Sequence, residues 1–192
     1  MKINGRFIVF TLILIVLATA CKFFFGPLLS WSGFSPVIAI ALFSGMVIRE
    51  RKISFLLPLL AVLMSDVIIQ LLYEQGAFPY AGFYSGQWKN YSILLAITLI
   101  GWMLKGRTTF SVMVGAVAAP TLFFLLSNLN VWMSQEVTYA KDFNGLMACY
   151  AAGLPFYKNA LIATLVFFPS ILFLYNYLVK HRSQLTLVPT NQ

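Results

Sequence analysis

Charged side chains are scarce in this sequence. Asp, Glu, Lys and Arg together make up 9% of its 192 residues, whereas soluble domains carry about 25%. The hydrophobic share is 60% and the mean hydropathy is +0.86, so the chain has too little polar surface to cover a globule in water. We therefore expect an integral membrane protein. Its length leaves room for about six crossings of roughly 20 residues each.

The residue types that enzymes and metal sites use are also rare. The chain has one histidine, His181, and two cysteines, Cys21 and Cys149. Two cysteines set no disulfide framework and match no zinc spacing, and the sequence contains no Walker-type phosphate loop. A nucleophile needs a nearby base, but His181 stands in the basic C-terminal tail, far from the clustered polar residues. We therefore predict no catalytic residue, no metal site and no cofactor.

Acidic residues are outnumbered, and the formal net charge is +8. Such an excess could indicate nucleic-acid binding, but the basic residues stand in small groups between apolar runs. This distribution is typical of the loop charges that orient a membrane protein. We expect the lipid bilayer, and no nucleic acid, as a partner.

Six apolar runs approach the ~20 residues of a spanning helix, within a single transmembrane domain, 1–192. They cover residues 7–25, 28–48, 53–73, 91–104, 109–128 and 159–179. The second and fourth offer only about 20 Å of regular helix, and Ser35-Pro36 is typical of a helix start inside the second. Irregular backbone must extend them, which requires burial by protein or a wet cavity. The predicted fold is an all-α bundle of six transmembrane helices.

Lysine and arginine are distributed unevenly between the two sides of this bundle. With the N-terminus inside, nine lie on the cytoplasmic side and four on the outer side. The asymmetry favours both termini inside, and we expect a multi-pass protein of the bacterial cytoplasmic (inner) membrane. The two long connections, 74–90 and 129–158, then lie outside, where long structured loops usually carry function.

The N-terminus has a second interpretation. Residues 1–6 followed by an apolar run and Ala18-Thr19-Ala20-Cys21 also fit a signal peptide or a weak lipoprotein box. We favour a retained first span, because the charges require an even number of crossings.

Asp66 is the ionisable residue that lies deep within an apolar run. Even the membrane-insertion scales with the smallest penalties assign a central aspartate an unfavourable free energy of about +2.5 to +3.5 kcal/mol. It should therefore face the bundle interior, within reach of polar groups at the outer ends of helices four to six. Gln70 and Tyr73 share its helical face. Two roles remain open for Asp66, namely packing between helices and direct contact with a ligand.

Polar and aromatic residues cluster at the outer ends of the spans, whereas the cytoplasmic halves are almost wholly apolar. This pattern predicts a cup that opens outward and binds a small organic ligand, roofed by the loop 129–158 with 144–157 as a lid. An interfacial belt of aromatic residues is the alternative. The predicted ligand-binding residues are Asp66, Gln70, Tyr73, Tyr84, Trp88, Asn90, Asn128, Asn130, Trp132 and Asn159.

Small residues at four-residue spacing mark two seams for close helix packing or for a partner. Ala41 and Gly45 form one seam near the inner end of the second helix, and Gly115 and Ala119 form the other in the fifth. Such spacing allows two helix backbones to approach closely.

This layout, with the segments GFSPVIAIALFSG, LLAVLMSDVIIQ, FLLSNLNVW and AAGLPFYKNALIATLVFF, resembles the S components of energy-coupling-factor (ECF) vitamin transporters. It is also similar to a bacterial membrane family of unknown function related to them. The resemblance covers roughly residues 30 to 178. It implies a vitamin-like ligand, such as a cobalamin, bound at the outer side, and energising transmembrane and ATPase partner subunits.

One departure from the S components concerns those partners. S components usually carry an Ala-x-x-x-Ala seam near the inner end of their first helix, but residues 8–16 here are bulky. The Ala41/Gly45 seam could replace it, or the chain could act alone. The alternative function is a non-catalytic structural subunit of a larger membrane complex.

Overall fold

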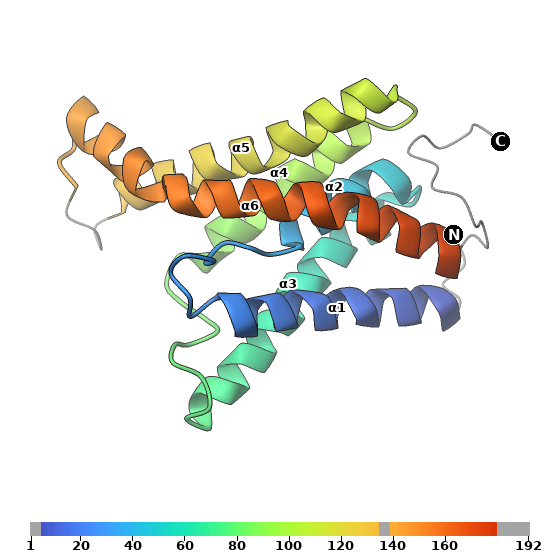
Figure 1. Cartoon of the computed structure of the whole chain (residues 1–192), viewed down its shortest axis with the longest axis horizontal. Coiled ribbons are helices and arrows are strands. Elements are labelled where there is room, and N and C mark those ends of the chain that lie inside the picture. Colours follow the sequence, from blue (N-terminus) through green and yellow to red (C-terminus); the bar gives the residue numbers. More distant parts are fainter. Residues whose placement is uncertain (1–4, 135–138, 180–192) are drawn as a thin grey trace.

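The computed structural model describes residues 5–134 and 139–179, which form six helices and no strand (Figure 1). The helices are α1 (Gly5–Phe25), α2 (Val37–Val47), α3 (Arg51–Glu74), α4 (Gln87–Met103), α5 (Thr109–Met133) and α6 (Phe143–Leu178). Four of them, α1, α3, α5 and α6, are long and apolar enough to cross a membrane. The predicted class, an all-α membrane bundle, is confirmed.

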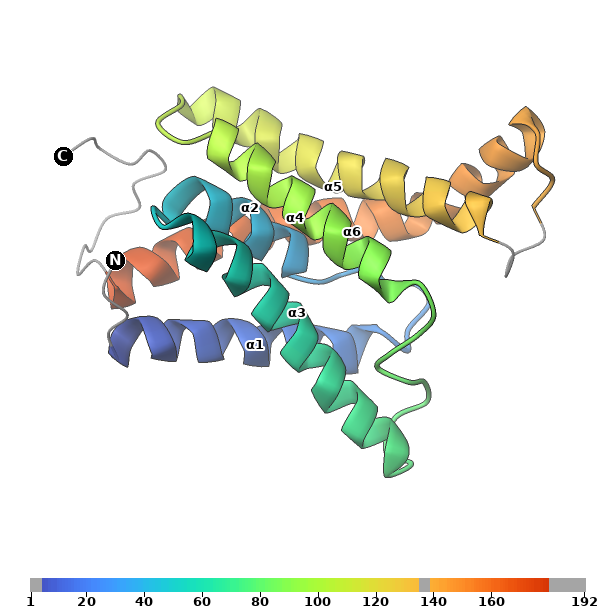
Figure 2. The same ribbon diagram turned by 180° about the vertical axis from the view of Figure 1, so that it is seen from behind.

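Five helices form a ring around the short α2 (Figure 2). Each ring helix packs on its neighbours in the order α1, α3, α4, α5, α6, and α6 closes the ring on α1. Nine of the 11 residues of α2 are buried, and its Phe43 ring lies 5.5 Å from that of Phe10 in α1, between centroids. At 1.5 Å per residue α2 is only about 17 Å long. It therefore fills one half of the ring and leaves the other half to loops and open space.

Glycines bring α2 and α4 into backbone contact. A Cβ atom on Gly45 would lie 2.0 Å from the carbonyl oxygen of Thr98, and one on Gly101 would lie 2.4 Å from that of Leu42. Ala41 is also fully buried. In the second seam, Gly115 faces the Leu104 side chain and Ala119 is buried. Both seams therefore pack helices of this chain together, and the Ala41/Gly45 seam is out of reach of a partner.

The second helix begins at Val37, directly after the Ser35-Pro36 start that the sequence predicts inside the apolar run 28–48. Residues 26–36 form an irregular loop, which Asn159 of α6 holds by donating 2.9 Å hydrogen bonds to the carbonyls of Ser30 and Ser32. These bonds satisfy backbone groups that the irregular backbone leaves free.

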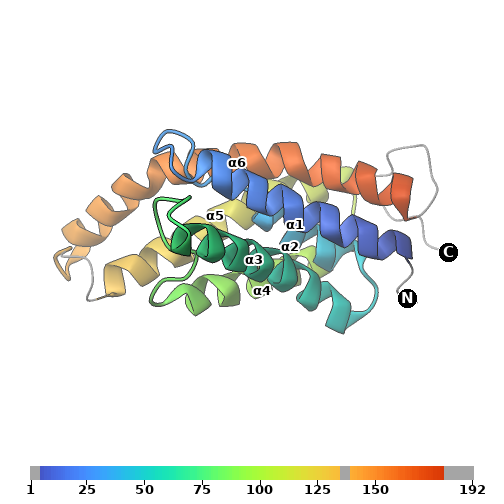
Figure 3. The ribbon, with the colours of Figure 1, turned by 90° about the horizontal axis from the view of Figure 1, so that it is seen from below.

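The predicted lid over residues 144–157 is wrong, because α6 begins at Phe143 rather than near 159. Asp142 caps this helix by accepting a 2.7 Å hydrogen bond from the Gly145 amide. The helix then continues past Gly153 and bends near Pro155 (Figures 1 and 3), as a missing N–H allows. Its first part packs along α5, which itself extends to Met133.

The two ends of the bundle differ in charge. The start of α1, the end of α6 and the short connections 48–50 and 104–108 lie at one end (Figure 1). We call this the basic end, because it carries Arg49, Arg51, Lys52, Lys105 and Arg107. The loops 26–36 and 75–86 lie at the opposite end, where the ring is open.

Candidate functional site

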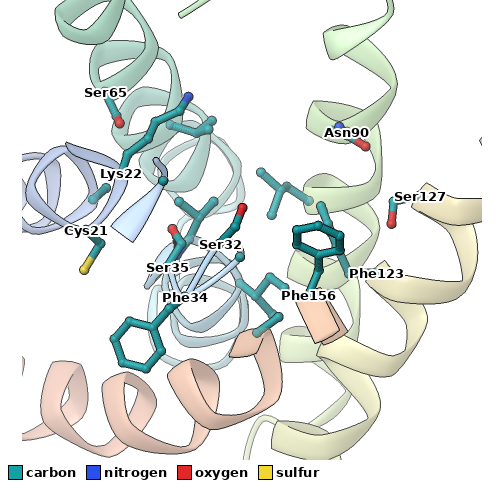
Figure 4. A pocket seen from close by; sticks show the side chains of 18 of the residues that line it. Cys21, Lys22, Ser32, Phe34, Ser35, Ser65, Asn90, Phe123, Ser127 and Phe156 are labelled. Carbon is teal, nitrogen blue, oxygen red and sulfur yellow. Dashed lines mark hydrogen bonds between the residues drawn. The ribbon is translucent and has the colours of Figure 1, made fainter. Parts of the chain in front are cut away.

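A cavity of about 360 Å³ lies between the first turn of α2 and the end of the bundle that is opposite the basic end. Residues of all six helices and of the loops 26–36 and 75–86 line it, and Figure 4 shows their side chains around it. Ligand pockets typically measure about 300 to 1,000 Å³. The half of the ring that α2 leaves unfilled therefore has the size of a site for a small molecule.

An ion pair forms part of the cavity wall. The Lys22 ammonium, in the last turn of α1, donates to Oδ1 of Asp66 in α3. The side-chain amide of Gln87 and the hydroxyl of Tyr91, both in α4, donate to Oδ2. Asp66 is 0% exposed, so these three donors replace the water that its carboxylate loses on burial. Asp66 faces the interior as predicted, and two of its partners come from α4, the fourth helix, but the third comes from α1 and none of these three comes from α5 or α6.

Gln87 connects this ion pair to the loop 75–86. Its amide also donates to the Gly82 carbonyl at 3.2 Å, and its Oε1 accepts from the Tyr84 amide at 3.2 Å. Gly82 lies directly on α3, where a Cβ atom would be 2.1 Å from the Asp66 carbonyl oxygen. The loop therefore covers one side of the cavity and depends on the same residues that hold Asp66.

The rim carries phenol and amide groups. Asn90 donates a 2.6 Å hydrogen bond to the Tyr84 hydroxyl. Burial raises the pKa of Tyr84, the bond from Asn90 opposes the shift, and the negative charge of Asp66 adds to it. Burial also raises the pKa of Tyr80. Both phenols are therefore neutral near pH 7 and can donate or accept a hydrogen bond.

Aromatic rings form the opposite wall. Phe123 and Phe124 of α5 and Phe156 and Tyr157 of α6 line the cavity, and the Phe124 and Tyr157 rings lie 4.9 Å apart between centroids. The Tyr157 hydroxyl is 2.9 Å from Oγ1 of Thr121. An apolar wall opposite a polar one suits an amphipathic organic molecule.

Four of the ten predicted ligand-binding residues line this cavity, namely Asp66, Tyr84, Asn90 and Asn128. The other six do not line it. They are Gln70, Tyr73, Trp88, Asn130, Trp132 and Asn159.

Helix geometry explains the two exposed aromatic residues. Gln87 and Tyr91 are four residues apart and both point inward, so Trp88, one residue further along the helix, points away. Its side chain is 66% exposed. Tyr73 lies two turns beyond Asp66 and is 44% exposed. Both have the exposed placement that an interfacial aromatic belt predicts.

Three of the remaining residues hold structure in place. Gln70 accepts from the Gly82 and Phe83 amides and so fixes the loop 75–86. Asn159 holds the loop 26–36, as described above. Trp132 donates to the Ala140 carbonyl at 2.8 Å, near the connection between α5 and α6. Asn130, two residues beyond Asn128, points to another side of α5.

Lys22, Gln87 and Tyr91 were missing from the prediction. Lys22 is a lone lysine inside an apolar run, and its depth below the outer surface matches that of Asp66, so the pair could have been found from opposite charges at equal depth. Gln87 and Tyr91 carry an i, i+4 spacing at the start of a helix, but this signal is common.

The described residues contain no group of three or more His, Cys, Asp or Glu side chains that could hold a metal ion. In a comparison with known protein families, the family model of DUF6580, a family of unknown function, matches residues 1–187 of the chain. No curated protein and no solved structure matches the chain.

Proposed function

Since the chain belongs to the DUF6580 family, whose function is unknown, we propose its function from the cavity. It is a membrane-embedded substrate-binding protein that serves the uptake of a small, vitamin-like organic micronutrient. This role agrees with the resemblance to the S components of ECF transporters. The same proposal places the chain in the bacterial inner membrane, with both termini in the cytoplasm.

The observation that carries the proposal is the position of the cavity. It lies in the half of the bundle remote from the basic end, and the positive-inside rule assigns the basic end to the cytoplasm. The cavity then faces outward, where a nutrient arrives. A structural subunit needs no such space.

The buried core of α2 supports binding rather than conduction. Ile40, Phe43 and Met46 are each at most 1% exposed and fill the centre of the ring between the cavity and the basic end. A channel needs polar groups through the full thickness of the membrane. A substrate therefore stops in the cavity until the protein or a partner changes its arrangement.

The volume of the cavity limits the size of the ligand. About 360 Å³ is near the lower limit of ligand pockets, so we propose a compact molecule rather than one as large as cobalamin. An energising partner cannot dock on Ala41 and Gly45, because both are buried and α4 packs directly on Gly45. Such a partner would contact the exposed side chains of the ring helices instead.

Filling the cavity tests the proposal. Ser127 lines it and donates to a carbonyl of its own helix, while Ser92 makes the same kind of bond outside it. The protein and the variants Ser127→Phe and Ser92→Phe would be purified in mild detergent, and native mass spectrometry would detect co-purified small molecules. We expect one with the wild type and Ser92→Phe, and its loss with Ser127→Phe. No small molecule in any sample would favour the structural subunit.

A further inference from the structure

Among the described residues, two charged ones line the cavity, and they are not equally accessible. The Lys22 side chain is 28% exposed, whereas Asp66 is 0% exposed. Both carboxylate oxygens are engaged by Lys22, Gln87 and Tyr91. The ammonium has three donor hydrogens, and its acceptor among the described residues is Asp66. A molecule in the cavity therefore meets the positive charge of this pair and not the negative one.

The first turn of α2 adds positive potential to the same space. Val37 and Ile38 line the cavity, and no side chain caps the helix at Pro36. The Val37 amide donates a long, 3.4 Å hydrogen bond to Oγ of Ser35, and the amides that follow it in the first turn have no capping side chain. Free amides at the N-terminus of an 11-residue helix attract negative charge, since the helix dipole is positive there.

Ser65 provides an independent indication of a ligand. Its side chain lines the cavity and is 2% exposed, yet its hydroxyl makes no hydrogen bond with any residue in 5–134 or 139–179. A hydroxyl that lines a cavity without a partner in the protein can donate a hydrogen bond to a ligand there and accept one from it. Figure 4 shows the Ser65 side chain on α3 beside the Lys22 side chain.

We infer that the ligand carries a single carboxylate, which the Lys22 ammonium, the Ser65 hydroxyl and the first turn of α2 recognise. This inference rests on the proposed function. The apolar body of the ligand packs against the aromatic wall formed by Phe123 and Phe156. A phosphate is disfavoured, because its second negative charge would need a further cation and none of the described arginines lines the cavity. An amine is disfavoured, because the Asp66 oxygens are covered.

Matched probes of one shape test this inference. Binding of radiolabelled 3-phenylpropionate to the purified full chain would be measured by scintillation proximity, with 3-phenylpropionamide and 3-phenylpropylamine as competitors. We expect the carboxylate to bind on the order of tenfold or more tightly than the amide, as a charge-assisted hydrogen bond implies. The amine should compete least. Equal binding of carboxylate and amide overturns the inference.

Two variants locate the selectivity. The double variant Lys22→Met/Asp66→Asn removes both charges without leaving one unpaired, and it should abolish the preference for carboxylate over amide while amide binding stays. Ser65→Ala should weaken carboxylate binding several-fold, whereas Ser92→Ala, outside the cavity, should not. If Ser65→Ala binds the carboxylate as the wild type does, the recognition we infer is wrong, even where the double variant fails to fold.

The outcomes separate this inference from the proposed function. If a co-purified small molecule is lost with Ser127→Phe but the three probes bind equally or not at all, the carboxylate inference fails and the proposed function stands. If no molecule co-purifies and no probe binds, both fail.

Discussion

Lys22 and Asp66 are 44 positions apart in the sequence, and their side chains form a salt bridge in the wall of the cavity. The pair joins α1 to α3, and Gln87 and Tyr91 add α4 through the second carboxylate oxygen. Three of the five ring helices are thereby tied together at one level, next to the space that we assign to the ligand. The stability of the bundle and the charge of the site thus depend on the same few atoms.

Lys22→Met should destabilise the protein more than the double variant Lys22→Met/Asp66→Asn. The single change leaves a buried carboxylate without its cation, and breaking a buried ion pair typically costs about 3–5 kcal/mol. The double change leaves neutral groups, and the amide oxygen that it places at position 66 can still accept from Tyr91. Thermal unfolding in detergent, followed by size-exclusion chromatography, measures both. Additive losses in the double variant would show that the two residues do not act as a pair.

Asp66 illustrates which parts of the fold and of the candidate site can be predicted from the sequence. Its isolation in an apolar run correctly placed it in the interior, and Ser35-Pro36 correctly indicated a short second helix with irregular backbone before it. Gln87 and Tyr91 could not be chosen from the sequence as partners of Asp66, because that choice depends on which helices are neighbours in the ring. Trp88 was predicted to line the site for a related reason. Which face of α4 points inward depends on Gln87 and Tyr91, whose inward position could not be known from the sequence. The prediction of a lid was wrong because α6 bends near Gly153 and Pro155 without ending there.

Gly45→Ala should prevent normal folding. The new Cβ atom would lie 2.0 Å from the Thr98 carbonyl oxygen and 3.0 Å from Cα of Gly101, and these backbone atoms cannot move without separating α2 from α4. Overpacking of this kind typically costs about 1–3 kcal/mol, and sometimes more. The readout is the yield of monodisperse protein and its melting temperature. Gly5→Ala is the control, because a Cβ atom there meets nothing within 4 Å.

A partner seam would behave differently from this packing seam. If Gly45→Ala folded with wild-type stability and lost only an interaction with another protein, the assignment of Ala41 and Gly45 to the α2 and α4 contact would be wrong.

Asn159→Ala should loosen the loop 26–36. The substitution removes the donors to the Ser30 and Ser32 carbonyls, and each lost hydrogen bond of this kind costs about 0.5–1.5 kcal/mol. Hydrogen–deuterium exchange should therefore speed up in peptides covering this loop. Asn130→Ala is the matched control, since the Asn130 side chain makes no hydrogen bond within the described part of the chain. Equal exchange in the two variants would contradict the role of Asn159.

Two matched lysines test the orientation of the bundle. In a background with Cys21→Ala and Cys149→Ala, the exposed residues Lys141 and Lys105 would be changed one at a time to Cys. A membrane-impermeant maleimide added to intact cells should label Lys141→Cys, because it lies away from the basic end, and should label Lys105→Cys only after the membrane is opened. The reverse pattern would turn the cavity toward the cytoplasm and remove the argument for uptake.

Phe123→Ala and Trp88→Ala should separate the cavity from the aromatic belt. Phe123 lines the cavity and faces the space assigned to the ligand, whereas Trp88 is 66% exposed and lies outside it. Loss of an aromatic contact worth about 0.5–1.5 kcal/mol beyond area burial should lower the amount of co-purified small molecule per mole of Phe123→Ala protein by several-fold. Trp88→Ala should retain the wild-type amount, since its ring anchors the helix at the membrane surface. If Trp88→Ala lost the molecule and Phe123→Ala retained it, the ligand would bind on the outer rim of the bundle, and the cavity between α2 and the two loops would have no part in recognising it.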